Sequence, residues 1–415
     1  MLDALNWIKA GAVQIPILAV DLPSGWGADE TSATAPGAVF PADAVITFTA
    51  PKAAHVFGHL TRRWNQPMVV APIGSPQEAI KAVLDAKSPN LTWAGSAMAL
   101  VQAPRAAGVN KGNFGHVLVV GGTFGTAGGK AGAPSMAALA ALRSGAGLVT
   151  AAVPAAAMAV VGAVAPELMI WPLAATPGGQ ISAANLLPEQ LALLVAGKTV
   201  LAIGPGMGQA LETVKYVTGL LSETKMPAIV DADALNALAT KPVLLTKLAK
   251  GRTLVLTPHP GEMARLLGIS IPEVQANRLE VARDFACRFG VTLVLKGART
   301  LIAHPDGRVA VNTTGNPGMA KGGSGDLLTG LVAGLLAQHP DHPGLAVDAA
   351  VYLHGLEADF AVQRMEEHTL LATDSLKDLS SAFHSRAFRL ESGGVSRYLW
   401  LQGVSPNAGL DEARP

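Results

Sequence analysis

Short, continuously apolar segments alternate with helical patterns through the main body of this chain, and this alternation constrains its fold more than any other feature. Helical patterns lie at 135–147, 209–223, 260–268, 275–289, 326–338 and 345–364, among the apolar segments "HVLVVGG", "LVTAAVP", "TVLAIGPGMG", "PAIVDADALNAL", "TLVLTPHPGE", "TLVLKGART" and "RVAVNTTG". Strands that are apolar on both faces are typical of a mostly parallel sheet with helices on both sides. The sequence therefore predicts a three-layer α/β/α fold with a mostly parallel central sheet.

The composition narrows the possible partners. Half of the 415 residues are apolar, 15% are charged and the formal net charge is +1, so we expect no binding of nucleic acid or of an anionic membrane surface. Cys287 is the only cysteine, which excludes an intrachain disulfide and a cysteine-based zinc site and fits a reducing compartment. The first twenty residues lack a basic start followed by an apolar run, so we expect no targeting segment and a cytoplasmic protein.

The most apolar stretch, residues 151–175, is long enough to be considered as a membrane span. Pro154, Pro166 and Glu167 interrupt it, and it is rich in alanine rather than leucine. We expect a buried helix–turn–strand there and no membrane helix.

Glycine-rich or polar clusters directly follow several of the apolar segments. In open α/β sheets, ligands bind outside the carboxyl ends of the strands. We therefore expect a binding site at this edge of the sheet, built from Gly121 and Gly122, Gly204–Gly208, Asp231 and Asp233, His259–Glu262 and Lys296–Thr300.

One loop, "GNPGMAKGGSGDLLTG" at 315–330, joins a glycine-rich run to Asp326 and an apolar helical pattern. Glycines let backbone N–H groups converge on an anion, and a helix that begins near Asp326 adds its positive end. Such a loop could hold a transferring phosphoryl group while Asp326 accepts a proton from a substrate hydroxyl. A flexible loop with an N-cap aspartate is the alternative interpretation.

The other motifs each leave two interpretations open. "GPGMG" at 204–208 could face phosphate or ribose, or form only a tight turn. Asp231 and Asp233 in "DADALN" could bind Mg²⁺ through water or cap the next helix.

"TPHPGE" places His259 between two prolines, where it could contact a ligand or simply begin a helix with Pro260 in the first turn. Lys296 in "LKGART" could contact a nucleotide or lie exposed to solvent. For His354 in "YLHGLEAD", helix packing is the favoured interpretation.

We expect four parts along the chain. Residues 1–75 hold three strands with little helix, residues 76–109 form a linker with a helix at 76–86, and residues 110–388 form the main body. The tail, 389–415, has weak periodicity and should be loosely ordered.

Residues 110–388 resemble the ribokinase-like dehydratase domain of the NAD(P)H-hydrate repair enzymes. The resemblance lies in "NKGNFGHVLVVGG", "GAPSMAALAALRSGAGLVT", "APELM", "IGPGMG", "VDADALNAL", "LTPHPGEMARLLG", "VLKGART", "NPGMAKGGSGDLLTG" and "VYLHGLEAD". The first block, "ILAVDLPSGWGADE…AVITFTAPK", resembles the last part of the partner domain, NAD(P)HX epimerase, which is Rossmann-like.

The resemblance implies a reaction and a set of site residues. The dehydratase uses ADP or ATP, with Mg²⁺, to phosphorylate the hydroxyl of hydrated NADH or NADPH, and loss of phosphate restores the cofactor. Asp326 would contact the hydrate and act as the base. The hydrate would also contact Ala133, Gly208 and His259. The adenine nucleotide would bind Lys296, Gly297, Ala298, Arg299, Thr300, Gly322, Gly323 and Gly325. The family also suggests a homo-oligomer.

The sequence departs from the family at two places. Asn110, Asn113 and His116 replace the usual residues of the first motif, and Lys321 stands where Thr or Ser is common; we expect altered affinity rather than lost activity.

In the first block, Asp21 and Ser24 match residues that contact the hydrate and K⁺ in the epimerases. Only the last strands of that domain are recognisable, so we expect a truncated remnant without epimerase activity, and K⁺ only if the site were complete. A fragment and an internal start are the two explanations left open.

Two other functions remain open from the sequence. A small-molecule kinase of the same fold, of the hydroxyethylthiazole kinase type, would also use the glycine-rich loop for phosphoryl transfer. A non-catalytic nucleotide-binding relic is the third hypothesis, against which the intact Gly323, Gly325, Lys296 and Asp326 argue.

Overall fold

The computed structural model describes residues 16–35, 37–61, 68–71, 73–76, 78–79, 91–126 and 128–385. The expected loose tail at 389–415 and most of the expected helix at 76–86 lie outside these ranges.

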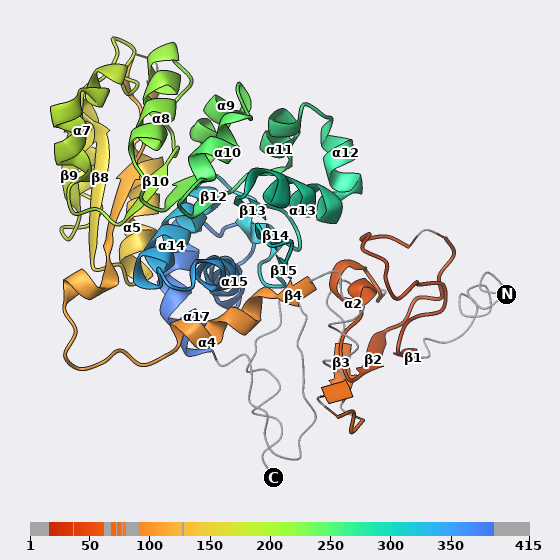
Figure 1. Ribbon diagram of the computed structural model, residues 1–415. Coiled ribbons are helices and arrows are strands. Elements are labelled where there is room, and N and C mark those ends of the chain that lie inside the picture. The colour runs from red at the N-terminus through yellow and green to blue at the C-terminus, as the bar shows by residue number, and fades with distance from the viewer. Residues whose placement is uncertain are drawn as a thin grey trace.

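The main body is built on a ten-stranded sheet in the order β4-β15-β14-β13-β12-β11-β10-β5-β8-β9 (Figure 1). Only β14 runs antiparallel to its neighbours, which confirms the predicted mostly parallel sheet. The strands are β4 Leu91–Trp93, β5 His116–Val120, β8 Leu148–Pro154, β9 Met169–Leu173, β10 Val200–Ile203, β11 Ala228–Val230, β12 Leu254–Leu256, β13 Thr292–Leu295, β14 Leu301–Ala303 and β15 Val309–Val311; a small hairpin adds β6 Phe124–Gly125 and β7 Gly128–Gly129.

Helices cover both faces of this sheet (Figure 1). One layer holds α4 Met98–Val101, α5 Gly132–Arg143, α6 Met158–Gly162, α14 Ser324–Gln338, α15 Pro343–Ala361, α16 Ala372–Ser375 and α17 Leu379–His384. The other holds α7 Pro188–Val195, α8 Leu211–Glu223, α9 Ala232–Ala239, α10 Leu244–Ala249, α11 Pro260–Leu267, α12 Ile271–Ala276 and α13 Arg278–Phe289.

The period of two along the strands divides the core. In β5, Val117 and Val119 pack in the cluster that contains α5, α14 and α15, whereas Leu118 and Val120 pack in the cluster that contains α8, α9 and α13. Successive side chains of a strand point to opposite faces, so a strand that is apolar at every position needs a helix layer on each side. The three-layer architecture follows from this requirement.

The segment at 151–175 folds as expected into the end of β8, helix α6 and strand β9. No helix within the described part of the chain is long and apolar enough to cross a membrane.

The main body begins earlier than residue 110. Strand β4 pairs in parallel with β15, and Ala94, Ala97 and Met98 of the following turns are buried in the first core cluster. The Trp93 ring packs edge-on against Tyr352 at 5.4 Å between centroids, and its Nε1 donates to Thr313 Oγ1 at 3.0 Å. Residues 91–101, expected as part of a linker, therefore belong to the main body: β4 joins the sheet, and the residues after it pack in the core. A three-residue strand is too short to be recognised from its pattern.

The first block is a three-stranded parallel sheet, β1 Leu18–Val20, β2 Ala44–Phe48 and β3 Met68–Ala71, with helix α2 Ala53–Phe57. Its small core contains Val45, Ala54 and Met68. Leu18 and Val20 on β1 are 59% and 63% exposed, so this side of the sheet lies open among the residues described. Val56 and Phe57 of α2 pack against the main body.

Candidate active site at the carboxyl edge of the sheet

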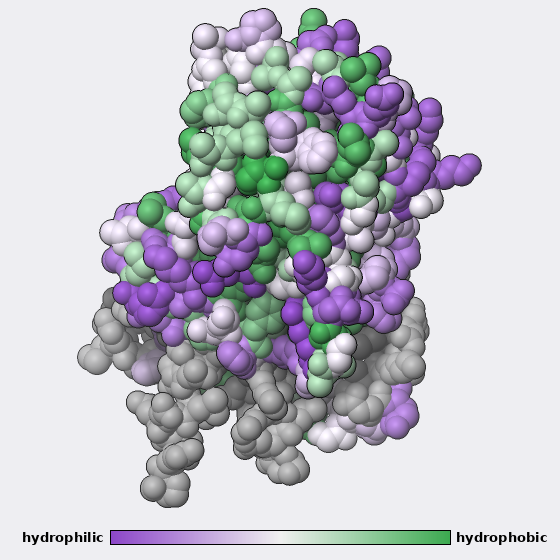
Figure 2. Space-filling view, turned by 90° about the vertical axis from the view of Figure 1, so that its left-hand side faces the viewer, coloured by the Kyte–Doolittle hydropathy of each residue, from purple (hydrophilic) through white to green (hydrophobic). Residues whose placement is uncertain are grey.

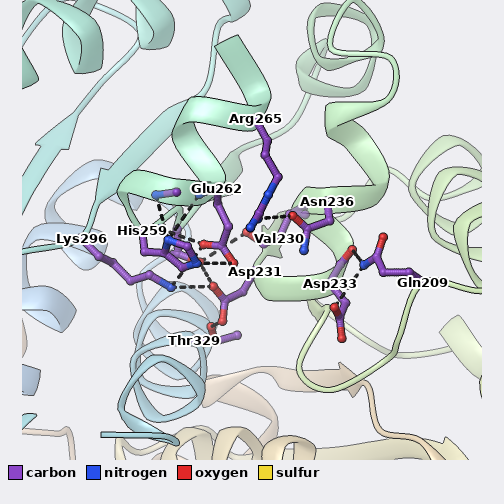
Figure 3. Close-up of polar contacts among 12 residues, drawn as sticks. Gln209, Val230, Asp231, Asp233, Asn236, His259, Glu262, Arg265, Lys296 and Thr329 are labelled. Carbon is purple, nitrogen blue, oxygen red and sulfur yellow. Dashed lines mark hydrogen bonds and ion pairs between the residues drawn. The ribbon is translucent and has the colours of Figure 1, made fainter. Parts of the chain in front are cut away.

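The carboxyl ends of β10, β11, β12 and β13 bring polar residues together above the first turn of α14 (Figure 3). Asp231 follows β11, Thr257 follows β12 and Lys296 follows β13. Several of the polar residues predicted at this edge therefore form a cluster of interacting side chains; that the cluster binds a ligand stays a prediction.

Asp231 lies at the centre of this cluster. Its side chain is 2% exposed, and it accepts hydrogen bonds from Thr257 Oγ1 at 2.7 Å, Thr329 Oγ1 at 2.9 Å and Lys296 Nζ at 3.1 Å. A buried carboxylate needs such partners because its desolvation is costly. Thr329 extends from α14, so Asp231 also joins the strand edge to the helix that carries Asp326.

Lys296 is directed into the site rather than into solvent. Its side chain is 22% exposed, and Nζ lies 3.1 Å from Asp231 and 3.9 Å from Glu262. Burial alone would lower the pKa of Lys296, but the two carboxylates outweigh it and raise the pKa. The lysine is therefore a fixed positive charge at the centre of the cluster, and the interpretation as an exposed lysine is wrong.

Asp326 lies in the first turn of α14, which begins at Ser324 after the N-cap Gly323. Burial raises the pKa of Asp326 to about 7; the charges of Asp231 and, to a smaller extent, Asp233 add to the increase, and Lys296 opposes it. A carboxyl with a pKa close to neutral is suited to accept a proton at physiological pH.

Two glycines shape the approach to Asp326. Gly323 has φ +100°, a conformation that L residues rarely adopt, and a Cβ there would lie 2.7 Å from Met136 Sδ. A Cβ on Gly325 would lie 3.4 Å from Lys296 Nζ, so the glycine keeps the space beside the ammonium group open. Backbone N–H groups of this first turn have no partner within the helix and can bind an anion.

His259 is the N-cap of α11, as the helix-start interpretation predicted. Its Nδ1 accepts from the N–H groups of Gly261 at 3.0 Å and Glu262 at 3.3 Å, and the Glu262 carboxylate accepts from the His259 N–H at 2.8 Å. Burial, and then the charges of Lys296 and Arg265, lower the pKa of His259. With Nδ1 accepting, the neutral ring carries its proton on Nε2, and the ring is half exposed. Contact with a ligand stays a prediction.

Neither aspartate of "DADALN" caps helix α9 with its side chain. Asp233 instead accepts from the Gly208 N–H at 2.8 Å and from Gln209 Nε2 at 3.1 Å, and lies 3.7 Å from Lys130 Nζ. Asp233 thus fixes the "GPGMG" turn, and Asp231 fixes Lys296.

The start of α5 lies against the same turn, since a Cβ on Gly206 would be 3.2 Å from the Cβ of Ala133. Ala133 therefore lies beside the turn that contains Gly208. Both residues are expected to contact the hydrate.

The described residues contain no group of three or more side chains that could hold a metal ion. Magnesium usually keeps several waters and binds through one or two carboxylates plus phosphates. The side chains present do not form a dedicated magnesium site, and no step below is assigned to the ion.

The loop Lys296–Thr300 is held by Arg278, whose Nη1 donates to the Ala298 carbonyl at 2.6 Å and whose Nη2 donates to the Leu295 carbonyl at 3.3 Å. Within the loop, Thr300 Oγ1 donates to the Gly297 carbonyl at 2.9 Å. The guanidinium of Arg299 donates to two backbone carbonyls, of Val56 and Thr313. The loop is therefore well defined before any ligand binds.

The sequence did not indicate several of these partners. Thr257, Thr329 and Arg278 all hold the site together, and no motif indicated them. The spacing of Asp326 and Thr329, three residues apart on one helix, was the one available signal that both would lie on the same face.

Two further residues named from the sequence have structural partners. His354 is buried in α15, as helix packing predicted; burial lowers its pKa to about 4, a hydrogen bond with the Ser324 backbone opposes this, and the charge of Lys296 adds to the decrease. Lys321 donates to the carbonyl of His368. The departures Asn110 and Asn113 cap each other's backbone in the turn at Lys111–Phe114, and His116 Nε2 lies 2.8 Å from Thr150 Oγ1.

The matched residues of the first block, Asp21 and Ser24, have their partners within that block. Asp21, with φ +67°, interacts through its carboxylate with Lys52 Nζ at 2.5 Å and with Thr47 Oγ1 at 2.7 Å, and its carbonyl lies 2.7 Å from His55 Nε2. Burial opposes but does not outweigh the hydrogen bonds from Lys52 and Thr47, which lower the pKa of Asp21. The Ser24 carbonyl accepts from the Phe40 N–H at 2.8 Å.

Comparison with known proteins agrees with this geometry. The bifunctional NAD(P)H-hydrate repair enzyme Nnr of Moorella thermoacetica is 44% identical over 364 residues, which are 86% of this chain and 65% of that protein. The ADP-dependent (S)-NAD(P)H-hydrate dehydratase of Neisseria meningitidis is 39% identical over 61% of this chain and 80% of that protein. The chain spans about two thirds of the length of its bifunctional relatives.

A solved structure shows the same fold. The crystal structure of the ADP/ATP-dependent NAD(P)H-hydrate dehydratase from Bacillus subtilis, co-crystallised with ATP/Mg²⁺, superposes with a TM-score of 0.57 at 33% identity and covers 69% of this chain and 96% of that one.

Family models match both parts of the chain. One described as YjeF-related protein N-terminus matches residues 1–54; the interpretation of this block as a truncated remnant stays a prediction. The other, described as NAD(P)H-hydrate dehydratase, matches residues 117–381, well over half of the chain. The chain therefore belongs to the NAD(P)H-hydrate dehydratase family.

Proposed function

We propose that this chain repairs hydrated NADH and NADPH by converting their S forms back to NADH and NADPH with ADP or ATP as the phosphoryl donor. The observation that carries the proposal is Asp326, a carboxyl with a pKa of about 7 in the first turn of a helix, beside Lys296 and an N-terminal glycine turn. The relatives' names supply the substrate class.

The chemistry would proceed in two steps. In the first step, the Asp326 carboxylate accepts the proton of the substrate hydroxyl while the hydroxyl oxygen forms a bond to the terminal phosphorus of the nucleotide. The bond from that phosphorus to the nucleotide breaks, so that ADP leaves as AMP and ATP leaves as ADP. In the second step, the C–O bond breaks and phosphate departs with its electrons. The adjacent carbon loses a proton, and the electrons of that C–H bond form the ring double bond. The positive charge of Lys296 and the first-turn N–H groups of α14 would stabilise the charge on the transferring phosphoryl group.

The remaining site residues take the roles that the resemblance implied. The nucleotide would bind Gly322, Gly323, Gly325 and, in the loop after β13, Lys296, Gly297, Ala298 and Thr300. The guanidinium of Arg299, also implied by the resemblance, donates instead to the carbonyls of Val56 and Thr313. The hydrate would contact Ala133, Gly208 and His259. The neutral ring of His259 could then donate from Nε2 to a polar group of the hydrate. Magnesium would accompany the nucleotide, held mainly by phosphates and water.

A test begins with recovery of absorbance at 340 nm from purified S-NADHX, Mg²⁺ and either ADP or ATP. The wild type should restore NADH with one nucleotide or both, which identifies the donor, and Asp326→Asn should lose at least about two orders of magnitude in rate, the usual contribution of a general base. Consumption of nucleotide with other hydroxylated substrates but never with NADHX would favour the small-molecule kinase. Failure to bind either nucleotide would favour a non-catalytic relic.

Epimerase activity is proposed to be absent from the 415-residue chain, because only Asp21 and Ser24 of that site were recognised. Purified protein should leave R-NADHX unconverted when the dehydratase step is blocked by withholding nucleotide. Measurable R-to-S interconversion by chiral chromatography would overturn this prediction.

We also propose a homo-oligomer that forms through the face at the β9 end of the sheet, where Figure 2 shows apolar side chains gathered. Val160, Val164, Met169, Leu187 and Leu193 are all between 39% and 63% exposed there. Between Gly147 and Lys198 the sequence contains no basic residue and only two acids, Glu167 and Glu189, and depletion of charge is typical of interface cores.

A cytoplasmic location also stays a prediction.

A further inference from the structure

The Lys296–Thr300 loop of the candidate site is joined to the first block by one side chain, that of Arg299. Arg299 Nε donates to the carbonyl of Val56 at 2.6 Å, across 243 residues of sequence, and Nη1 donates to the carbonyl of Thr313 at 3.1 Å. Thr313 lies just before the glycine-rich loop that leads to Asp326. One guanidinium therefore contacts three segments: the first block, the nucleotide loop and the entry to the catalytic loop.

The backbone at Arg299 is unusual in a way that fits this role. Its φ of +54° lies in the left-handed region, which costs free energy for a residue other than glycine. The conformation is maintained by Arg278, which holds the Ala298 carbonyl at 2.6 Å, and by Thr300, which holds the Gly297 carbonyl at 2.9 Å. A conformation that neighbouring contacts keep in place despite its strain is characteristic of functional loops.

The acceptor on the first block is suited to an arginine. Val56 is the penultimate residue of α2, and the last carbonyl groups of a helix lack partners within the helix. A cationic side chain near this end also interacts favourably with the negative end of the helix dipole. Val56 and Phe57, both partly buried, pack on the main body beside this contact.

A buried acid extends the connection into the catalytic loop. Asp359 of α15 accepts from the Gly315 N–H at 2.9 Å and from Asn316 Nδ2 at 3.0 Å, at the start of the glycine-rich loop. Asp359 and Arg299 lie close enough for each charge to shift the pKa of the other group. Displacement of the guanidinium would therefore affect both the nucleotide loop and the loop that leads to Asp326.

We infer that Arg299 is a positioning residue whose side chain couples the first block to the nucleotide loop, rather than a ligand of the nucleotide itself. This inference deepens the proposed function and rests on it for the identity of the ligand. Binding of nucleotide to the Lys296–Thr300 loop should stabilise α2, and loss of the α2 contact should weaken binding of the nucleotide.

The test compares Arg299→Met and Arg299→Lys with the wild type in the full chain, by hydrogen exchange and steady-state kinetics. In the wild type, ATP or ADP with Mg²⁺ should slow amide exchange in residues 53–58. Arg299→Met should remove this response, speed exchange at 313–316 and raise KM for nucleotide about tenfold, or about 1.4 kcal/mol, with a smaller change in kcat. Arg299→Lys keeps the positive charge but cannot donate to the Val56 and Thr313 carbonyls at the same time, which the guanidinium does. It should therefore restore only part of the exchange response and of the nucleotide affinity.

Arg364→Met is the matched control, because Arg364 pairs with Asp378 on the surface far along the chain from these loops. It should leave KM and exchange at 53–58 unchanged. A weakened nucleotide affinity in Arg299→Met with an unchanged exchange response in α2 would make Arg299 a nucleotide ligand and overturn the inference. Wild-type values for both measurements would overturn it as well.

Phe57→Ala provides a second variant if Arg299→Met does not fold. It leaves the arginine intact and loosens α2 on the main body, so it should raise KM for nucleotide in the same direction. An unchanged KM in a folded Phe57→Ala protein whose α2 exchanges faster would contradict the coupling. If the wild type binds nucleotide but restores no NADH, the proposed function fails while binding affinity and hydrogen exchange still test the coupling.

Discussion

At the scale of single residues, Asp326 and Asp231 share one electrostatic environment with different outcomes. Asp231 has hydroxyl and ammonium partners on both oxygens, whereas the pKa of Asp326 rises to about 7 because it is buried near the charge of Asp231. Asp326 is therefore the acid at this edge that is suited to exchange a proton near neutral pH.

The pKa of Asp326 predicts a cost in stability. An acid whose pKa is higher in the folded state destabilises that state progressively as pH rises from about 4 to about 7. Asp326→Asn should therefore raise the free energy of unfolding at pH 8 by about 1–3 kcal/mol, since one pKa unit corresponds to about 1.4 kcal/mol and solvent screens part of the effect. Urea unfolding at pH 8 and at pH 4 measures it.

The difference should shrink at pH 4, where the carboxyl is protonated in the folded state and only about half ionised in the unfolded state. Asp341→Asn, at an exposed position, is the control, and its free energy of unfolding should differ little from that of the wild type at either pH. A variant Asp326→Asn that is less stable than the wild type at pH 8 would show that the carboxylate is stabilised in the fold.

The charge of Asp231 predicts a change in the pH profile. In Asp231→Asn, Asp326 loses a neighbouring negative charge and keeps the opposing Lys296, so its pKa should fall. The acid limb of kcat/KM against pH should move down by about one pH unit. Thr329→Val removes a hydrogen bond to Asp231 but leaves the charge of Asp231 unchanged. The acid limb of kcat/KM in this variant should stay at the wild-type pH. An unmoved limb in Asp231→Asn would mean that another group controls the profile.

At the scale of elements, the start of α14 determines where Asp326 lies. The helix begins directly after a left-handed glycine, and its axis continues into a segment that is buried from Leu327 to Ala337. The first turn therefore cannot shift without moving a buried helix, which keeps Asp326 and Thr329 at fixed positions relative to Asp231.

Gly323→Ala should destabilise this start, while Gly322→Ala should not. The first variant places a Cβ at φ +100° and 2.7 Å from Met136 Sδ, whereas a Cβ on Gly322 meets nothing within 4 Å. We expect a loss of about 2 kcal/mol for Gly323→Ala and less than about 0.5 kcal/mol for Gly322→Ala in urea unfolding. Equal losses in the two variants would show that the left-handed cap is unimportant.

At the scale of the whole molecule, the sheet presents its β9 edge to the surface. Pro172 lies within β9, and proline cannot donate to a neighbouring strand. A second copy would therefore meet this face through side chains rather than by extending the sheet.

Met169→Glu places a charge in this face, at a residue that is 39% exposed. If the face is the oligomer interface, the variant should dissociate to monomers in light scattering while retaining its circular dichroism spectrum, because an unpaired charge in an interface is costly. Val243→Glu, at a residue that is 77% exposed just before α10, in the connection between β11 and β12, is the control and should keep the wild-type assembly. A monomeric wild type, or an oligomeric Met169→Glu, would exclude this interface.

The layers of the main body could be predicted from the sequence, since apolar strands and helical periods are local patterns that burial imposes on each segment. So could the glycines and acids at the carboxyl edge. Which groups meet there depends on the folded chain: Thr329 contacts Asp231 across 98 residues, and Lys296 contacts it across 65. The tertiary structure likewise placed β4 in the sheet and turned Arg299 toward the first block. Such partners, and the pKa of Asp326 that follows from them, depend on how distant segments pack, which no local pattern encodes.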